Sequence, residues 1–219
     1  MTISLSEAKK IKLFNRVERK YKCTKNQLYL LLGLLKENYY LVTDIDDDDD
    51  FVFKYHSLYF DTPEMIMFNA HENSEQHRQK IRIREYSDGE KFLEIKDKDE
   101  NGITRKSRIP VDSYVIDGEK QWIDKNLMYD TIVLNKTLDI TYDRITLVSR
   151  DKTERITIDF NICFHNFIND ISRTIDDVII EVKQVNEYDS FIIEELNKLN
   201  IERVKFSKYH IGIKLTKEE

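Results

Sequence analysis

Charged residues recur at every second position along residues 80–108, and this alternation constrains the fold more than any other feature. Two turn sequences, SDG and DENG, divide the stretch into three runs. In the first run Lys80, Arg82 and Arg84 alternate with Ile81 and Ile83. Because side chains alternate between the faces of a strand, the pattern predicts an antiparallel meander with one basic and one apolar face. The basic face of such a meander either lies in water or binds an anion.

The same alternation of charged and apolar residues returns elsewhere in the chain. Together with the meander, further strands are predicted at 15–22, 55–61, 141–149, 154–160 and 178–185. Helices are predicted at 25–38, with a capping box from Thr24 to Gln27, and at 190–199, capped at Asp189–Ser190. Residues 1–13 are expected to form a polar helix or arm. Residues 111–138 have a helical texture, with Asp112 as the cap and Trp122 as the core anchor.

Eight antiparallel strands are the number that closes a small barrel. The sequence therefore predicts an α+β fold, in which a closed eight-stranded antiparallel β-barrel has a basic lumen and helices on its outside. Buried unpaired charges cost several kcal/mol each. The inward carboxylates are too few to neutralise the cations, so the lumen is expected to take a linear polyanion. The expected inward carboxylates are Glu18, Glu94, Asp159 and Glu181.

Composition narrows the possible partners. The formal net charge of -6 argues against a nucleic-acid binder, which is normally basic. Two cysteines make no disulfide framework, and the N-terminus has no apolar signal core. The expectation is a cytoplasmic protein without a membrane segment, forming one domain over 1–219 with its core at about 16–212. The acidic run at 44–50 is interpreted as a solvated loop. A Walker A sequence is absent, so side-chain cations would have to bind any phosphate.

Six ordered motifs are similar to those of the triphosphate tunnel metalloenzymes, and within that group the chain most resembles the VTC domain, the polyphosphate polymerase module. The motifs are Arg16-x-Glu18-x-Lys20, Tyr59-Phe60-Asp61-Thr62-Pro63, Arg82-Ile83-Arg84, Leu93-Glu94-Ile95-Lys96, Glu181-Val182-Lys183 and Phe206-Ser207-Lys208-Tyr209. The resemblance implies transfer of the terminal phosphate of ATP to a growing polyphosphate chain. It also implies a divalent cation, Mn²⁺ or Mg²⁺, and binding of ATP, triphosphate and polyphosphate.

The resemblance and the alternating basic faces together give each candidate residue an expected role. The residues expected near the reacting phosphates are Arg82, Arg84, Lys205, Ser207 and Lys208. Those expected to bind phosphate are Lys20, Lys22, Lys96, Lys98, Lys106, Arg108, Arg144, Arg155 and Lys183. Glu181, with Glu18, is the expected metal carboxylate.

The chain departs from the wider superfamily at Arg16, where the hydrolytic and cyclase members usually have a glutamate. A cation at this position weakens a second metal site and favours a longer anionic ligand. Two alternatives stay open: an inorganic triphosphatase, with water as the acceptor, and a module that binds polyphosphate or inositol phosphates without turnover. A nucleic-acid-binding barrel is disfavoured by the net charge and by the lack of a stacking platform.

Overall fold

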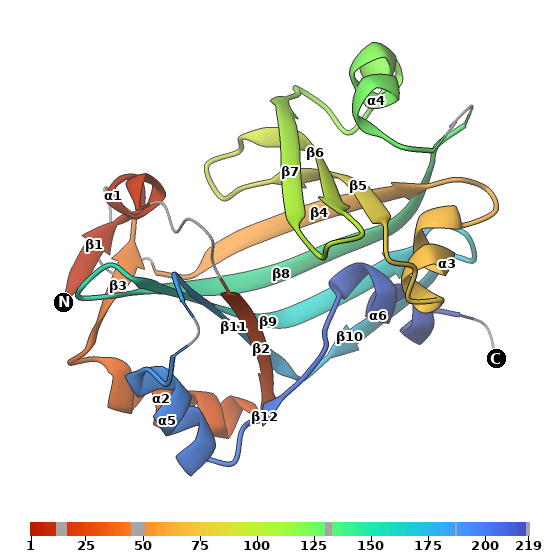
Figure 1. The fold of residues 1–219 in the computed structure, drawn as a ribbon. Coiled ribbons are helices and arrows are strands. Elements are labelled where there is room, and N and C mark those ends of the chain that lie inside the picture. The colour runs from red at the N-terminus through yellow and green to blue at the C-terminus, as the bar shows by residue number, and fades with distance from the viewer. Residues whose placement is uncertain (12–16, 45–50, 130–132, 187, 218–219) are drawn as a thin grey trace. The chain divides into compact units, whose positions relative to one another are not determined.

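The computed structural model describes residues 1–11, 17–44, 51–129, 133–186 and 188–217. Twelve strands belong to one sheet, in which hydrogen bonds follow the order β12-β2-β11-β9-β8-β4-β5-β6-β7 (Figure 1). Off this path, β3 pairs with β8, β1 with β3 in parallel, and β10 with β9. The strands are β1 (Thr2–Ser4), β2 (Val17–Cys23), β3 (Tyr39–Thr43), β4 (Phe53–Asp61), β5 (Arg78–Glu85), β6 (Lys91–Lys98), β7 (Thr104–Pro110), β8 (Asn135–Ser149), β9 (Glu154–Asn166), β10 (Ile171–Ile175), β11 (Val178–Gln184) and β12 (Glu202–Arg203).

The helices are short, and in the chain all but the last, α6, lie between these strands. They are α1 (Leu5–Lys10), α2 (Lys25–Leu35), α3 (Ile66–Glu72), the 3-10 turn η1 (Asp117–Glu119), α4 (Lys120–Asn126), α5 (Phe191–Lys198) and α6 (Lys208–Leu215). Among the described residues, none of these helices combines the length and the apolar character needed to cross a membrane.

The chain divides into two compact units. Unit 1 comprises Met1–Lys54, Tyr142–Ile162 and Ile175–Phe206, and unit 2 comprises Tyr55–Thr141, Cys163–Thr174 and Ser207–Glu219. The long strands β8 and β9 contribute residues to both units. Each unit has a hydrophobic core of its own.

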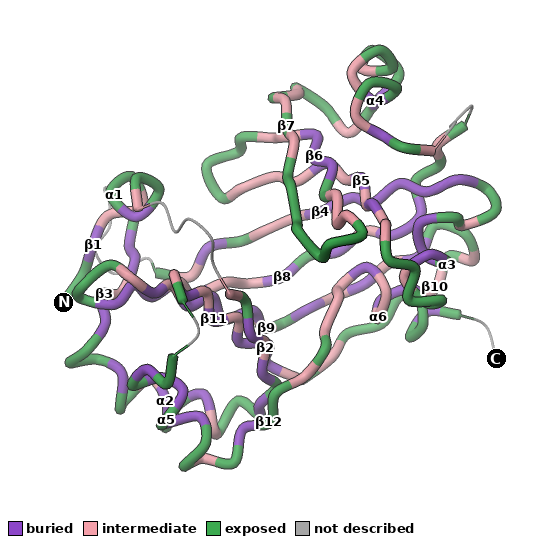
Figure 2. The backbone as a smooth tube through the Cα atoms, in the orientation of Figure 1, coloured by how far each residue is buried: buried purple, intermediate pink, exposed green. Residues whose placement is uncertain are grey.

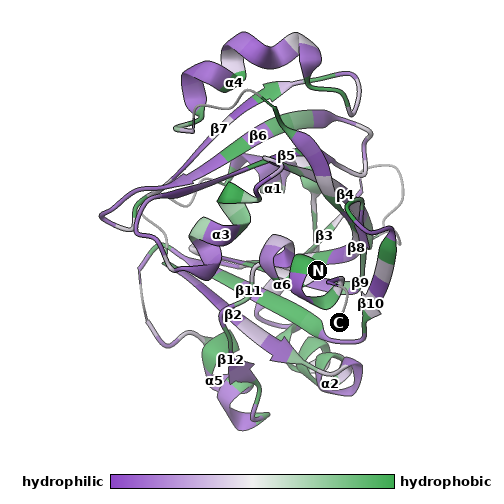
Figure 3. Ribbon diagram, turned by 90° about the vertical axis from the view of Figure 1, so that its right-hand side faces the viewer, coloured by the Kyte–Doolittle hydropathy of each residue, from purple (hydrophilic) through white to green (hydrophobic). Residues whose placement is uncertain are grey.

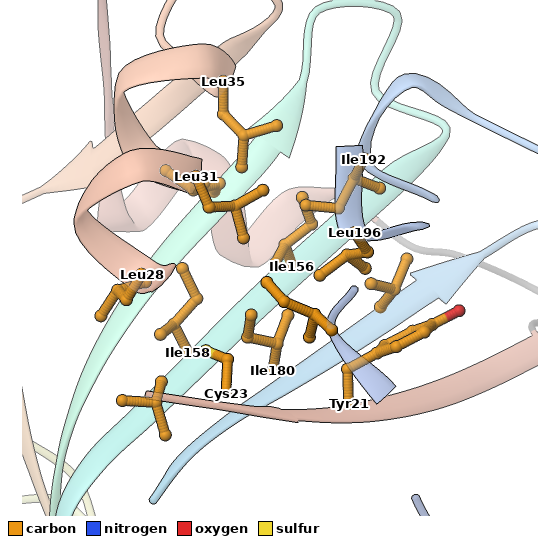
Figure 4. Close-up of a cluster of buried hydrophobic side chains, with 14 of the residues drawn as sticks. Tyr21, Cys23, Leu28, Leu31, Leu35, Ile156, Ile158, Ile180, Ile192 and Leu196 are labelled. Atoms are coloured by element: carbon orange, nitrogen blue, oxygen red, sulfur yellow. The ribbon is translucent and has the colours of Figure 1, made fainter. Parts of the chain in front are cut away.

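In unit 1 the core lies between the sheet and two helices that pack side by side, α2 and α5 (Figures 1 and 4). Leu28, Leu31 and Leu35 follow a helical spacing on α2, which places all three on one face. They meet the apolar face of β2, β9 and β11, together with side chains of α5. Residues of this core include Tyr21, Cys23, Ile156, Ile158, Ile180, Ile192 and Leu196. The predicted capping box is confirmed, because Thr24 Oγ1 accepts from the backbone N–H of Gln27 at 3.2 Å while the Gln27 side chain accepts from that of Thr24.

In unit 2 the core lies on the apolar face of the predicted meander, so the alternation is confirmed. Ile81 pairs with Ile95 and Ile83 with Leu93 across β5 and β6, and all four are fully buried. They pack against Met67 of α3 and the apolar residues of the segment that contains α4. Figure 3 shows α4 as largely hydrophilic, in keeping with a helix that covers the core with one narrow face.

Several element predictions need correction. Among the described residues of 111–138, helical structure is confined to η1 and α4. Asp112 caps neither, because Ile116 and Glu119 occupy the cap positions. Trp122 is half-buried against the unit 2 core, whereas its neighbour Ile123 is buried. Ser190 does stand at the start of α5, but its hydroxyl donates to Glu154 at 2.6 Å instead of capping the helix.

The prediction of a closed eight-stranded barrel is wrong. The sheet has twelve strands, and among the described residues its hydrogen-bonded path does not close, since it ends at β12 and β7. Both ends suit the edge of a sheet: β12 has two residues, and β7 is charged, exposed along most of its length and ends at Pro110 (Figure 2). Alternation in a sequence indicates which face a residue occupies, but it does not indicate the pairing of the outermost strands. Arg16 and residues 45–50 lie outside the described residues.

Candidate phosphate-binding faces

In unit 2, the face of β5, β6 and β7 opposite the core carries rows of cations. One cross-strand row is Lys80, Lys96 and Lys106, and the next is Arg82, Glu94 and Arg108. Residues in such a row lie about 4.5–5.5 Å apart at their Cβ atoms, so their charges interact strongly. Like charges placed directly opposite one another destabilise a sheet. The first row is therefore an arrangement that an anionic ligand would stabilise.

Glu94 is the centre of this face and is 1% exposed. Its Oε2 accepts hydrogen bonds from Arg82 Nε at 2.9 Å and Nη2 at 2.8 Å, and its Oε1 forms an ion pair with Lys106. Burial raises the pKa of Glu94, but the charges of Arg82, Arg84 and Lys106 outweigh it and hold the pKa at about 2. The single carboxylate of Glu94 is thus surrounded by the positive charges of Arg82, Arg84 and Lys106.

The pKa of Lys106 is also lowered, which in a lysine favours the neutral form. Burial and the nearby charges of Arg82 and Arg84 lower its pKa to about 8, although Glu94 acts against the shift. An anion bound beside Lys106 would favour its charged form.

Aromatic rings line the arginines of this face. The guanidinium groups of Arg82, Arg84 and Arg108 lie 5.6, 5.9 and 4.5 Å from the ring centres of Tyr59, Tyr55 and Phe92, respectively. A nearby ring orients the planar fork of a guanidinium. The fork of Arg82 already donates to Glu94 and, from Nη1, to the Tyr59 hydroxyl at 2.7 Å. Such a fork matches the oxygens of a phosphate.

At the start of α6, Ser207 is joined to the same face. Its hydroxyl accepts from Lys80 Nζ at 2.7 Å and from the backbone N–H of His210 at 3.4 Å, so it also caps the helix. His71 Nδ1 lies 3.4 Å from Lys80 Nζ. Burial, with the charges of Lys80, His210 and Arg78, lowers the pKa of His71 to about 3, so its imidazole is neutral and can accept from the lysine.

In unit 1, the face opposite the core is organised around Glu181, whose side chain is 16% exposed. It forms ion pairs with Lys183 at 2.8 Å and with Lys20 at 3.7 Å. Burial raises the pKa of Glu181, but Lys183, Lys20 and Arg144 outweigh it, so the pKa lies well below its usual range. The carboxylate is therefore ionised and already shared by two ammonium groups.

Two arginines of this face have other partners. Arg144 grips Asp159 through two hydrogen bonds, Nε to Oδ1 at 2.6 Å and Nη2 to Oδ2 at 2.8 Å. Arg155 donates to the backbone carbonyls of Ala8 and of Ile11 at the end of α1. Both were expected to bind phosphate, and both have partners that orient them in unit 1.

The remaining predicted residues are Glu18, Lys22, Lys98, Lys205 and Lys208. Lys22 is 47% exposed and pairs with Asp177 at 3.5 Å. Lys98 stands at the end of β6, and Lys205 is exposed between β12 and α6. Lys208 is the first residue of α6, and Glu18 is exposed opposite Lys183.

Two carboxylates of unit 1, Glu18 and Glu181, could bind a divalent cation that enters together with phosphate. No group of three or more His, Cys, Asp and Glu side chains that could hold a metal ion occurs in the described part of the chain. By register, Glu18 and Glu181 are diagonal neighbours on one face of β2 and β11. Mg²⁺ is usually bound by one or two carboxylates plus substrate phosphates. Glu181, with Glu18, therefore fits a cation whose other ligands come from phosphate and water.

Comparison with known sequences identifies the family. Residues 15–217 match the profile of the VTC domain. The chain belongs to the VTC domain family. The match covers both units and every predicted site residue. A comparison with curated proteins finds no match.

Solved structures share the fold of this VTC domain. HpAC1 from Hippeastrum, described as having a dominant triphosphatase activity, superposes with a TM-score of 0.56 at 14% identity, covering 92% of this chain and 98% of that one. PH1819 from Pyrococcus horikoshii OT3 gives a TM-score of 0.53 at 12% identity, covering 91% and 96%. At such identities the similarity concerns the fold.

Sequence reasoning missed two residues of these faces. Lys80 was placed on the basic face with Arg82 and Arg84 but not among the site residues, and alternation gave no sign of its bond to the distant Ser207. Thr157 lies directly opposite Glu181, but an uncharged residue in a strand gave no signal.

Proposed function

We propose that this VTC domain is a polyphosphate polymerase that transfers the terminal phosphate of ATP to a growing inorganic polyphosphate chain. The whole of 1–219 would act as one functional domain, with its core at about 16–212, in the cytoplasm. Membership of the VTC domain family supports the proposal.

The observation that carries the proposal is the shortage of carboxylates on both faces. In unit 2, Glu94 is shared by Arg82 and Lys106, with Arg84 also close enough to lower its pKa. In unit 1, Glu181 is shared by Lys20 and Lys183. Partly buried cations in excess of their carboxylates are costly without an anion. A polyanion of repeating phosphates supplies many acceptor oxygens at once, which suits forked arginines and point-charge lysines together.

Each group then has a role in phosphoryl transfer. Arg82 and Arg84 would bind the oxygens of the transferring phosphoryl group, where charge develops in the transition state. Lys80 and Ser207, joined by a 2.7 Å hydrogen bond, would position a phosphate at the start of α6. Glu181, with Glu18, would hold a divalent cation, Mg²⁺ or Mn²⁺, which neutralises phosphate charge when bound. A separate general base is not required, because a phosphate terminus is already an anionic nucleophile.

An inorganic triphosphatase is the second candidate, and the activity described for HpAC1, which shares the fold, favours it. The same cations would bind triphosphate, with water as the acceptor. The difference lies in the product, since hydrolysis releases free phosphate and polymerisation lengthens a chain.

Product analysis tests the proposal. The purified protein is incubated with Mn²⁺ or Mg²⁺ and with either ATP or inorganic triphosphate, and the phosphorus species are followed by ³¹P NMR. A growing signal of bridging phosphates, together with ADP, supports the polymerase. Free phosphate alone selects the triphosphatase. Binding of triphosphate without turnover, across several metals, selects a module that binds phosphate without catalysis.

A further inference from the structure

Thr157, near the start of β9, carries a buried hydroxyl that nothing in the described part of the chain bonds to. The residue is 4% exposed. Other buried threonines of the protein have partners: Thr137 Oγ1 donates to the carbonyl of Tyr59 at 3.1 Å, and Thr216 Oγ1 to that of Gly212 at 2.7 Å. Among the buried threonines of the described residues, Thr157 is therefore an exception that calls for an explanation.

The position of Thr157 connects it to the charged face of unit 1. Strand pairing places it directly opposite Glu181, which in turn lies opposite Lys20. Arg155 and Asp159, two residues to either side on β9, share its face. Thr157 thus lies in a cross-strand row with a carboxylate and an ammonium group, at the centre of the predicted phosphate-binding residues.

The free-energy cost of an unbonded buried hydroxyl suggests that Thr157 has a functional role. A buried hydroxyl without a hydrogen bond costs about 1–3 kcal/mol. Valine has nearly the same shape, favours strands equally well and lacks the polar atom. Threonine at this position makes the ligand-free protein less stable than valine would, so the compensating interaction is expected in the ligand-bound state.

We propose that the Thr157 hydroxyl donates a hydrogen bond to a phosphate oxygen of the bound substrate, as a further positioning residue of unit 1. The inference rests on the proposed phosphate chemistry. The ammonium groups of Lys20 and Lys183 would turn from Glu181 to the arriving phosphate, and the Thr157 hydroxyl on the neighbouring strand would complete its hydrogen bonds. A phosphate oxygen can accept the hydroxyl's hydrogen bond, and these two ammonium groups attract the phosphate to this row.

The test compares Thr157→Val with Thr157→Ser, which restores the hydroxyl. Thr141→Val, an exposed position on β8, is the matched control. Calorimetry measures the binding of inorganic triphosphate in EDTA, and thermal unfolding reports the stability of the free protein. We expect Thr157→Val to unfold at or above the wild-type temperature yet bind triphosphate about tenfold more weakly. Thr157→Ser should recover most of the affinity, and Thr141→Val should match the wild type in binding.

Two outcomes overturn the inference while leaving the proposed function intact. In the first, the wild type binds triphosphate and Thr157→Val binds it equally well, which makes the threonine structural only. In the second, Thr157→Val binds as the wild type in EDTA and is weakened only when Mn²⁺ is added, which makes the hydroxyl a ligand of the cation. If the wild type itself does not bind triphosphate, the proposed function and the inference fail together.

Discussion

The hydroxyl of Tyr209 donates a hydrogen bond of 2.6 Å to the carboxylate of Asp61, which is completely buried in unit 2. Asp61 also accepts from the backbone N–H groups of Thr62, Met67 and Phe68 and so satisfies donors at the start of α3. Burial, reinforced by Asp61, raises the pKa of Tyr209 well above its usual value. This hydrogen bond therefore joins the motif at 59–63 to the motif at 206–209, and it holds Ser207 close to Lys80.

Tyr209→Phe should destabilise the protein by about 1.5–3 kcal/mol, because it removes one donor from a buried carboxylate. Denaturant unfolding measures the change. Tyr29→Phe is the control, since the side chain of Tyr29 is 71% exposed on α2. Equal stability of the two variants would show that Asp61 does not depend on the tyrosine.

Glu94 should make the protein sensitive to acid. Its pKa in the folded protein is about 2, against an ordinary value of 4.5. Its stabilisation is therefore fully present above pH 4.5 and is lost as the pH falls toward 2, by an amount on the order of 3 kcal/mol. Glu94→Gln should lower stability at neutral pH and flatten the fall in this window, whereas Glu100→Gln, in an exposed turn, should not. Denaturant unfolding across the pH range checks this, and equal slopes for wild type and Glu94→Gln would contradict it.

Triphosphate binding should weaken as the pH rises through about 8, because Lys106 then loses its proton. Below this pH the ammonium group is charged and attracts phosphate. Lys106→Arg should retain its affinity up to pH 10, since a guanidinium does not deprotonate. Calorimetry of inorganic triphosphate at several pH values measures the difference. Parallel losses in the wild type and in Lys106→Arg would assign the pH dependence to another group.

Removal of Lys183 should improve the binding of a cation in the absence of phosphate. Glu181 is held by Lys183 at 2.8 Å and by Lys20 at the longer distance of 3.7 Å. Lys183→Met leaves the carboxylate only the weaker pair, so we expect Mn²⁺ to bind several-fold more tightly, as measured by electron paramagnetic resonance. Lys120→Met, on α4, is the control for loss of one positive charge. Unchanged Mn²⁺ affinity in Lys183→Met would show that Glu181 is not a ligand of the cation.

Local alternation in the sequence predicted the two faces of the sheet correctly, because burial requires Ile81, Ile83, Leu93 and Ile95 to share one side. Alternation did not reveal how the cations are paired. Glu94 and Glu181 each serve two cations, and that sharing depends on neighbours from other strands. The closed barrel failed for a similar reason, since the edges of a sheet are decided by residues far apart in the chain.

Helix α6 could not be predicted from its own residues. Gly212 in its middle weakens the helical signal. The structure shows why glycine is needed: a Cβ there would lie 2.5 Å from Phe164 Cδ1 and 2.6 Å from Leu138 Cδ2. The helix approaches the strands so closely that tertiary packing, rather than propensity, determines it.

The most direct test of the proposed polymerase compares the products of the wild type and Glu181→Gln. Each protein is incubated with ATP and Mn²⁺, and the products are separated on a gel stained for polyphosphate, with Glu194→Gln on α5 as the control. We expect the wild type and Glu194→Gln to produce long chains that require the metal, and Glu181→Gln to remain folded and produce none. Free phosphate without chains from the wild type, or undiminished chains from Glu181→Gln, would contradict the account.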